Sequence, residues 1–196
     1  MMLGGGLKIE KKKKKKPVRD PANLESEDCD YIRENCLKSP EDLRNFDEVV
    51  GARTAKMFAE QYQPVSTGAT RVLSGLLLFG PSGTGKSLLA EAITHYIRGT
   101  FYRFSAADLP PGDKGARRIN ALFDVALNGS LPAVIFIDEC DTVLSKAAPV
   151  RIGQFAQRFE RFTDNLLVIG ATNEPEKIAP KILTGRFERK IHVDNP

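Results

Sequence analysis

The sequence of 196 residues lacks several features that would point to particular classes of protein. No apolar run approaches the roughly 20 residues that a membrane-spanning helix needs, and the first ten residues lack the apolar stretch of a secretory signal. The three cysteines form neither a CxxC pair nor a Cys/His ligand spacing, so zinc is unsupported and reduced thiols are expected. No internal repeat occurs at a fixed period. These absences favour a soluble, cytoplasmic protein without membrane insertion.

The positive charge of the chain is concentrated in a short N-terminal segment. Residues 1–19 hold eight Lys or Arg side chains and one acid, which leaves 21 basic and 24 acidic residues, a net charge of −3, for the rest. Because neighbouring like charges repel, residues 1–22 are expected to form a disordered arm, and residues 23–196 one domain. A solvated tail is the simpler interpretation of this arm, and contact with an acidic partner or a nuclear-import signal is the alternative. The mildly acidic body argues against nucleic-acid binding.

Short apolar runs alternate with helical stretches along the rest of the chain. Strands are expected at 76–79, 101–104, 134–137, 166–169 and 191–193. Helices are expected from Ser26, as N-cap, to before Ser39, and over 52–63, 86–98 and 114–127, where apolar residues recur at helical spacing. Fully apolar strands are typical of parallel sheets that are covered by helices on both faces. The sequence therefore predicts an α/β domain.

A glycine-rich segment follows the first of these strands. It fits the pattern GxxxxGK[ST] without a mismatch: Gly80, Pro81, Ser82, Gly83, Thr84, Gly85, Lys86 and Ser87. The strand before it and the amphipathic helix after it are the context in which this pattern binds nucleotide phosphates. Leu88, the next residue along the chain, is expected to bind the cofactor as well. The glycines let backbone N–H groups turn toward phosphate oxygens. We expect Lys86 to reach the β- and γ-phosphates and the Ser87 hydroxyl to ligate Mg²⁺; a glycine-rich turn without a ligand is the alternative.

Polar residues also stand at the ends of two later strands. Asp138 and Glu139 come directly after the strand at 134–137, at the end of a parallel strand where α/β folds bind ligands. Asp138 is expected to hold Mg²⁺ through water, and Glu139 to act as general base toward an attacking water. Asn173 follows the strand at 166–169. We expect its amide to hydrogen-bond the γ-phosphate or the attacking water, with an ordinary turn residue as the alternative.

With these motifs the chain resembles the AAA family of ATPases over roughly residues 28–196. The resemblance is carried by the glycine-rich segment 80–87, IFIDECD (135–141), GATNEP (170–175) and GRFERKIHV (185–193). The subgroup that it resembles contains spastin, katanin, fidgetin and the ESCRT-disassembling ATPases. The resemblance implies a P-loop NTPase fold with a five-stranded parallel sheet in the order 5-1-4-3-2, flanked by helices. It also implies ATP and Mg²⁺ as cofactors.

Members of this family form hexameric rings, in which an arginine of one subunit completes the site of its neighbour. The resemblance places this role on Arg186, and a surface arginine paired with Glu188 is the alternative. Val50 and Gly51 match the segment that packs against the adenine.

The chain departs from the family in three places. Residues 108–115 contain two prolines and no aromatic residue, where members that thread polypeptides carry one. Only one arginine, Arg186, stands where relatives often carry more. The chain ends at Pro196, so the C-terminal helical lid of the family is expected to be absent.

Two functions remain open at this point. The first is Mg²⁺-dependent ATP hydrolysis by a self-associating ring that remodels or disassembles a protein complex, with tubulin or another filament as candidate substrate and microtubule severing as one outcome. The second is a nucleotide-dependent protein-binding module with little or no hydrolysis and no threading of a substrate.

Overall fold

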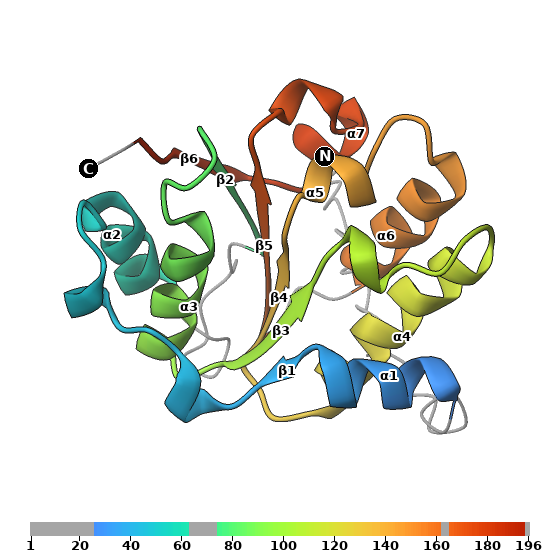
Figure 1. Ribbon diagram of the computed structural model, residues 1–196, viewed down its shortest axis with the longest axis horizontal. Helices are drawn as coiled ribbons and strands as arrows, with labels where there is room; N and C mark the ends of the chain where they lie inside the picture. Colours follow the sequence, from blue (N-terminus) through green and yellow to red (C-terminus); the bar gives the residue numbers. More distant parts are fainter. Residues whose placement is uncertain (1–25, 63–73, 162–164, 195–196) are drawn as a thin grey trace, which may run out of the picture.

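The computed structural model describes residues 26–62, 74–161 and 165–194, and within them it contains a six-stranded sheet in the order β1-β3-β4-β5-β2-β6 (Figure 1). The strands are β1 (Leu37–Lys38), β2 (Gly75–Phe79), β3 (Thr100–Phe104), β4 (Ala133–Ile137), β5 (Leu166–Thr172) and β6 (Arg189–His192). The last five pair in parallel, and β1 pairs antiparallel with β3. Numbered along the chain, the five parallel strands have the expected order 5-1-4-3-2. The short edge strand β1 was not predicted.

Helices alternate with these strands. They are α1 (Glu27–Asn35), α2 (Arg53–Gln61), α3 (Lys86–Tyr96), α4 (Lys114–Asn128), α5 (Cys140–Val143), α6 (Pro149–Arg161) and α7 (Pro180–Leu183). The 3₁₀ turns are η2 (Pro40–Asp42), η3 (Phe46–Glu48), η5 (Ala106–Asp108) and η6 (Pro175–Lys177). Each of the four predicted helices is present, and Ser26 caps α1 by accepting a hydrogen bond from the Cys29 backbone N–H at 3.3 Å. The predicted disordered arm, residues 1–22, lies outside the described residues.

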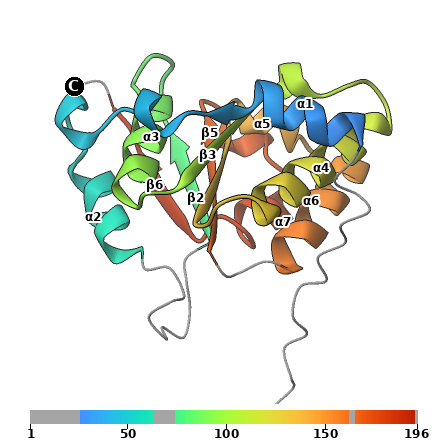
Figure 2. The same ribbon diagram turned by 90° about the horizontal axis from the view of Figure 1, so that it is seen from below.

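The helices cover both faces of the sheet. In Figure 1, α2 and α3 lie on one side of the strands and α1, α4 and α6 on the other, and Figure 2 shows the same separation from below. Side chains of one strand alternate between the two cores: Leu77 packs with the α4 side and Leu76 and Leu78 with the α3 side. This two-sided burial explains why the strands are continuous apolar runs.

Helix α6 was missed by the sequence prediction. It begins at Pro149, a residue whose fixed φ suits the first turn of a helix. Its buried side chains, Ile152, Phe155, Ala156 and Phe159, follow the spacing of one helical face and join the core on the α4 side.

Strand β2 lies between β5 and β6, and the glycines Gly75 and Gly80 at its two ends closely approach the chain around β6. A Cβ on Gly75, at the start of the strand, would lie 2.0 Å from the carbonyl oxygen of Arg186. A Cβ on Gly80, just after the strand, would lie 2.2 Å from the carbonyl oxygen of Val193. Glycine is therefore required at both positions, because the chain before and after β6 passes directly against β2.

Candidate functional site

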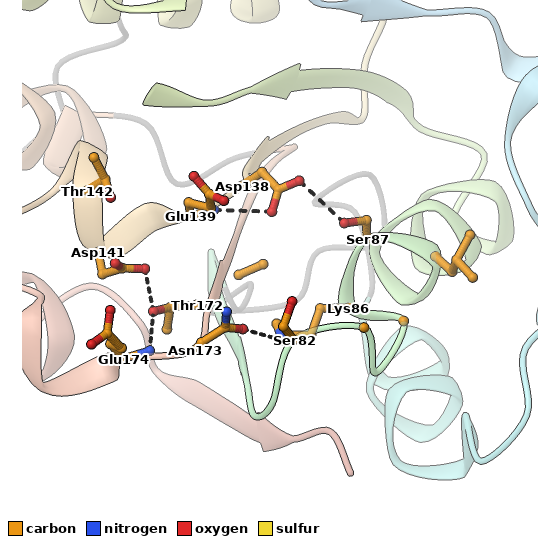
Figure 3. Close-up of a pocket in the computed structure, with 14 residues that line it drawn as sticks. Ser82, Lys86, Ser87, Asp138, Glu139, Asp141, Thr142, Thr172, Asn173 and Glu174 are labelled. Carbon is orange, nitrogen blue, oxygen red and sulfur yellow. Dashed lines mark hydrogen bonds between the residues drawn. The ribbon is translucent and has the colours of Figure 1, made fainter. Parts of the chain in front are cut away.

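A pocket of about 550 Å³ lies at the carboxyl ends of β2, β4 and β5. Its walls come from the segment after β2 with the start of α3, from the segment after β4 with α5, and from the end of β5 with the residues that follow (Figure 3). The carboxyl edge of a parallel sheet is the place where α/β folds bind ligands. The three predicted motifs therefore meet in one cavity whose volume suits a small molecule.

The segment after β2 forms a loop that three glycines make possible. Gly80, Gly83 and Gly85 have φ values of 147°, 78° and 86°, a region that favours glycine over other residues. Gly85 directly precedes α3, so the first N–H groups of that helix face the pocket without partners within the helix. The Thr84 hydroxyl donates to the Pro81 carbonyl at 3.0 Å. Thr84 is buried and stabilises the loop, and it does not line the pocket.

Lys86 joins the glycine-rich loop to the end of β5. Its Nζ donates to the carbonyl oxygens of Gly80 at 2.8 Å and Pro81 at 2.6 Å, and to Oδ1 of Asn173 at 2.8 Å (Figure 3). Burial lowers the pKa of the Lys86 ammonium, and the negative charge of Asp138 opposes this shift. Two residues predicted from separate motifs, Lys86 and Asn173, are thus in direct contact.

The carboxylate of Asp138 faces the start of α3. Its Oδ2 lies 3.4 Å from the Ser87 hydroxyl, which donates to it, and its Oδ1 accepts from the Glu139 backbone N–H at 3.1 Å (Figure 3). The guanidinium of Arg103, on β3, also contacts this carboxylate: its Nη2 lies 2.7 Å from the same Oδ2.

The oxygens of Ser87 and Asp138 fit a magnesium ion that is shared with phosphates. A hydroxyl and a carboxylate are hard ligands, and Mg²⁺ is commonly held by one or two protein oxygens together with substrate phosphates. Within the described ranges, no group of three or more His, Cys, Asp or Glu residues is arranged to hold a metal by itself. A set of one hydroxyl and one carboxylate suits a metal that arrives with a nucleotide.

Glu139 lies at the pocket in an uncommon backbone conformation. Its φ and ψ are both 48°, in the left-handed region, where residues other than glycine are infrequent. Such backbone strain costs about 1–3 kcal/mol and is concentrated at functional sites. The conformation turns the chain sharply from β4 into α5, and it leaves the Glu139 side chain exposed at the pocket wall.

Five further residues line the pocket that sequence reasoning did not assign: Asp141, Thr142, Ala171, Thr172 and Glu174. The Thr172 hydroxyl donates to Oδ1 of Asp141 at 2.5 Å and accepts from the Glu174 backbone N–H at 2.9 Å. These bonds tie α5 to the end of β5. Asp141 and Thr172 both stand inside the segments that carry the family resemblance, so the signal was present in the sequence. The sequence signal for Arg103 was weaker: it is a single charged residue in the otherwise apolar strand predicted at 101–104.

Six of the predicted residues do not line the pocket: Gly80, Pro81 and Thr84, which belong to the glycine-rich loop itself, and Val50, Gly51 and Arg186. Val50 and Gly51 follow η3, which packs against α3 through an edge-to-face contact of Phe46 with Tyr96, and neither lines the pocket. Val50 is 81% exposed. Arg186 lies at the opposite end of β2, where its guanidinium donates to the carboxylate of Glu160 and to the Gly185 carbonyl.

A strand, a glycine-rich loop and a helix, with two acids at the end of a nearby parallel strand, define a P-loop nucleotide-binding domain. The sequence model of the "ATPase family associated with various cellular activities (AAA)" matches residues 76–195. The chain therefore belongs to the AAA family of ATPases.

Relatives and solved structures agree with this assignment. Spastin of Sus scrofa is 31% identical, with 94% of this chain and 33% of that protein aligned. A probable spastin homolog of Brugia malayi is 35% identical, with 90% and 47% aligned. The chain thus spans a third to a half of the length of these relatives. The crystal structure of the FIGL-1 AAA domain in complex with ADP matches with a TM-score of 0.71 and 27% identity, over 85% of this chain and 60% of that one. None of the helices in the described part of the chain is long and apolar enough to cross a membrane.

Proposed function

We propose that the chain binds ATP together with Mg²⁺ in this pocket and hydrolyses the bond between the β- and γ-phosphates. Water adds to the γ-phosphorus, the bond to the bridging oxygen breaks, and ADP and inorganic phosphate are the products. The observation that supports this most strongly is the convergence of Lys86, Ser87, Asp138, Glu139 and Asn173 on one pocket at the carboxyl edge of the sheet.

Lys86 and the N–H groups at the start of α3 would bind the phosphates. The contacts that the ammonium makes to Gly80, Pro81 and Asn173 use neutral oxygens. Charged phosphate oxygens are stronger hydrogen-bond acceptors than these neutral oxygens, so a bound triphosphate can take their place around the ammonium. Mg²⁺, held by Ser87 and Asp138, would neutralise charge on the β- and γ-phosphates.

Glu139 would accept the proton of the attacking water, and Asn173 would orient that water or the γ-phosphate. Glu139 stands next to Asp138, so a base at this position lies beside the metal-holding carboxylate. Asn173 is already joined to Lys86, which sets it close to the expected γ-phosphate position.

Arg186 would act on the nucleotide of a neighbouring subunit. The five residues of β2 span about 16 Å, and Arg186 lies at the amino end of this strand whereas the pocket lies at the carboxyl end. Its own pocket is therefore out of reach, and a cation at this position can stabilise the transferring phosphoryl group only in trans. We accordingly propose self-association into a ring, with Val50 and Gly51 against the adenine.

We further propose that hydrolysis drives the remodelling of a protein complex in the cytoplasm. The matched spastins and the FIGL-1 AAA domain support this assignment, and the resemblance to the severing subgroup makes microtubules the first substrate to test. The second candidate, a binding module that does not thread its partner, is supported by the loop at residues 108–115, which has two prolines and no aromatic residue.

The test of hydrolysis is the Glu139→Gln variant. Phosphate release by the chain with Mg²⁺ and ATP should fall by at least about 100-fold, because general-base catalysis is lost. ATP affinity should stay within about threefold, because the phosphate-binding groups are intact. Glu60→Gln, at an exposed position of α2, is the matched control and should hydrolyse at the original rate. An unchanged rate in Glu139→Gln would contradict the proposal.

Gel filtration of Glu139→Gln with ATP separates the two candidate functions. An ATP-dependent oligomer supports the ring. A variant that binds ATP but stays monomeric, together with an original chain that hydrolyses no ATP, supports the binding module.

A further inference from the structure

The proposed metal position has a cationic side chain of the protein beside it. Arg103 lies on β3, directly next to β4, and the pairing of these strands continues to Asp138, whose N–H donates to the Phe104 carbonyl at 2.8 Å. Arg103 is paired with Phe136, two residues before Asp138, so the two side chains share one face of the sheet. This register brings Nη2 of Arg103 to 2.7 Å from Oδ2 of Asp138.

The oxygen that Arg103 contacts is the one that faces Ser87. The Ser87 hydroxyl lies 3.4 Å from Oδ2, whereas Oδ1 is turned toward the Glu139 backbone. A magnesium ion held by Ser87 and Asp138 would therefore meet the guanidinium at a shared oxygen. Arginine does not lose its proton in proteins, and a +1 and a +2 charge this close repel strongly.

We propose that Arg103 and Mg²⁺ compete for Asp138, so that Arg103 sets the metal concentration at which the nucleotide–metal complex forms. The inference rests on the proposed function, and it concerns the regulation of the same site. In this account Arg103 is a positioning residue: it neutralises Asp138 until the metal, brought by the phosphates, displaces it.

The surroundings of Arg103 allow this displacement. Its side chain is 54% exposed, and its backbone N–H is fixed by the Cys36 carbonyl at 2.7 Å, so the guanidinium can turn into solvent without moving the strand. Because solvent reaches the guanidinium, it does not become an unpaired buried charge when it leaves Asp138.

Removal of the guanidinium has two consequences of opposite sign. Metal binding should become tighter, because the competing cation is lost. Nucleotide binding in the absence of metal should become weaker, because the negative charge of Asp138 is then uncompensated beside the phosphates. General damage to the pocket would weaken both metal binding and nucleotide binding. Tighter metal binding together with weaker metal-free nucleotide binding therefore identifies competition.

The experiment uses Mn²⁺ as the probe for the metal and ADP as the nucleotide. Free Mn²⁺ is measured by electron paramagnetic resonance in titrations of the ADP-bound chain. Arg103→Gln should lower the Mn²⁺ dissociation constant by about tenfold, the size of effect that groups around metal ligands commonly have. Arg103→Lys keeps the charge and should stay within about threefold of the original. Arg117→Gln, an exposed arginine on α4 that does not line the pocket, is the matched control.

The second titration measures fluorescent ADP with EDTA present, where Arg103→Gln should bind several-fold more weakly. An unchanged Mn²⁺ constant in Arg103→Gln, or a change of both constants in the same direction, would overturn the competition while leaving the proposed function intact. A chain that binds ADP neither with nor without Mn²⁺ would overturn the proposed function itself.

Discussion

The two ends of strand β2 present opposite kinds of structure. At the carboxyl end the chain opens into a pocket whose wall carries lysine, serine, aspartate and glutamate side chains (Figure 3). At the amino end Gly75 packs against the Arg186 carbonyl and the Phe159 ring, without space for a methyl group. One five-residue strand therefore separates a site built for exchangeable contacts from a site of fixed packing.

Each end also holds one of the predicted cations. Lys86 is satisfied by neutral oxygens that a phosphate can replace, whereas Arg186 is paired with the carboxylate of Glu160 on α6. If both cations act in hydrolysis, the cation inside the pocket and the cation at the far end must therefore act on nucleotides of different subunits. This comparison gives three predictions.

The largest expected effect belongs to Arg186 at the amino end. Arg186→Gln should leave ADP affinity within about twofold, because Arg186 is remote from the pocket of its own chain. It should lower ATP hydrolysis at high protein concentration by about 1,000-fold, the contribution of an arginine supplied in trans. Rates measured as a function of protein concentration check this. Lys181→Gln on α7 is the control. Hydrolysis by Arg186→Gln at the original rate would show that Arg186 does not act on the nucleotide of a neighbouring subunit.

The next effect belongs to Lys86 at the carboxyl end. Lys86→Gln removes a charge-assisted contact with the phosphates, and ADP affinity should fall by about 10- to 100-fold. Isothermal titration calorimetry measures the dissociation constant. Lys56→Gln, at an exposed position of α2, should bind like the original chain. Equal affinities of all three proteins would mean that the pocket does not bind phosphates through Lys86.

The last effect is one of packing, and it concerns the stability of the chain and not nucleotide binding or hydrolysis. Gly75→Ala places a methyl group 2.0 Å from the Arg186 carbonyl oxygen, and the free energy of unfolding should fall by about 2–3 kcal/mol. Gly153→Ala is the matched control, because a Cβ there meets no atom within 4 Å and the residue lies within α6. It should raise the free energy of unfolding by about 0.5–1 kcal/mol. Urea denaturation measures both, and equal stability of the two variants would contradict the close packing at the amino end.

Much of the carboxyl end could be predicted from the sequence. The glycine-rich pattern fixes a local loop, and the apolar runs before the polar residues mark strand ends. These two local signals are enough to place Lys86, Asp138 and Asn173 at one edge of a parallel sheet. The positions of Val50, Gly51 and Arg186 relative to a nucleotide stay predictions.

The sequence prediction missed helix α6, strand β1 and the Arg103–Asp138 contact, each for a different physical reason. The period of Ile152, Phe155, Ala156 and Phe159 could have revealed α6, since its apolar face is regular. Strand β1 has two residues and exists only through its pairing with β3, so no local pattern marks it. The contact of Arg103 with Asp138 depends on the register of β3 and β4, which strand order alone does not give.

The central claim is that a nucleotide's phosphates bind between Lys86 and the Ser87–Asp138 pair. A crystal structure of the chain with ADP and Mg²⁺ tests it most directly. The account predicts the β-phosphate within hydrogen-bond distance of Lys86 Nζ, the metal at Ser87, and the Arg103 guanidinium turned away from Asp138. A nucleotide bound elsewhere, with Lys86 still on the carbonyls of Gly80 and Pro81, would contradict it.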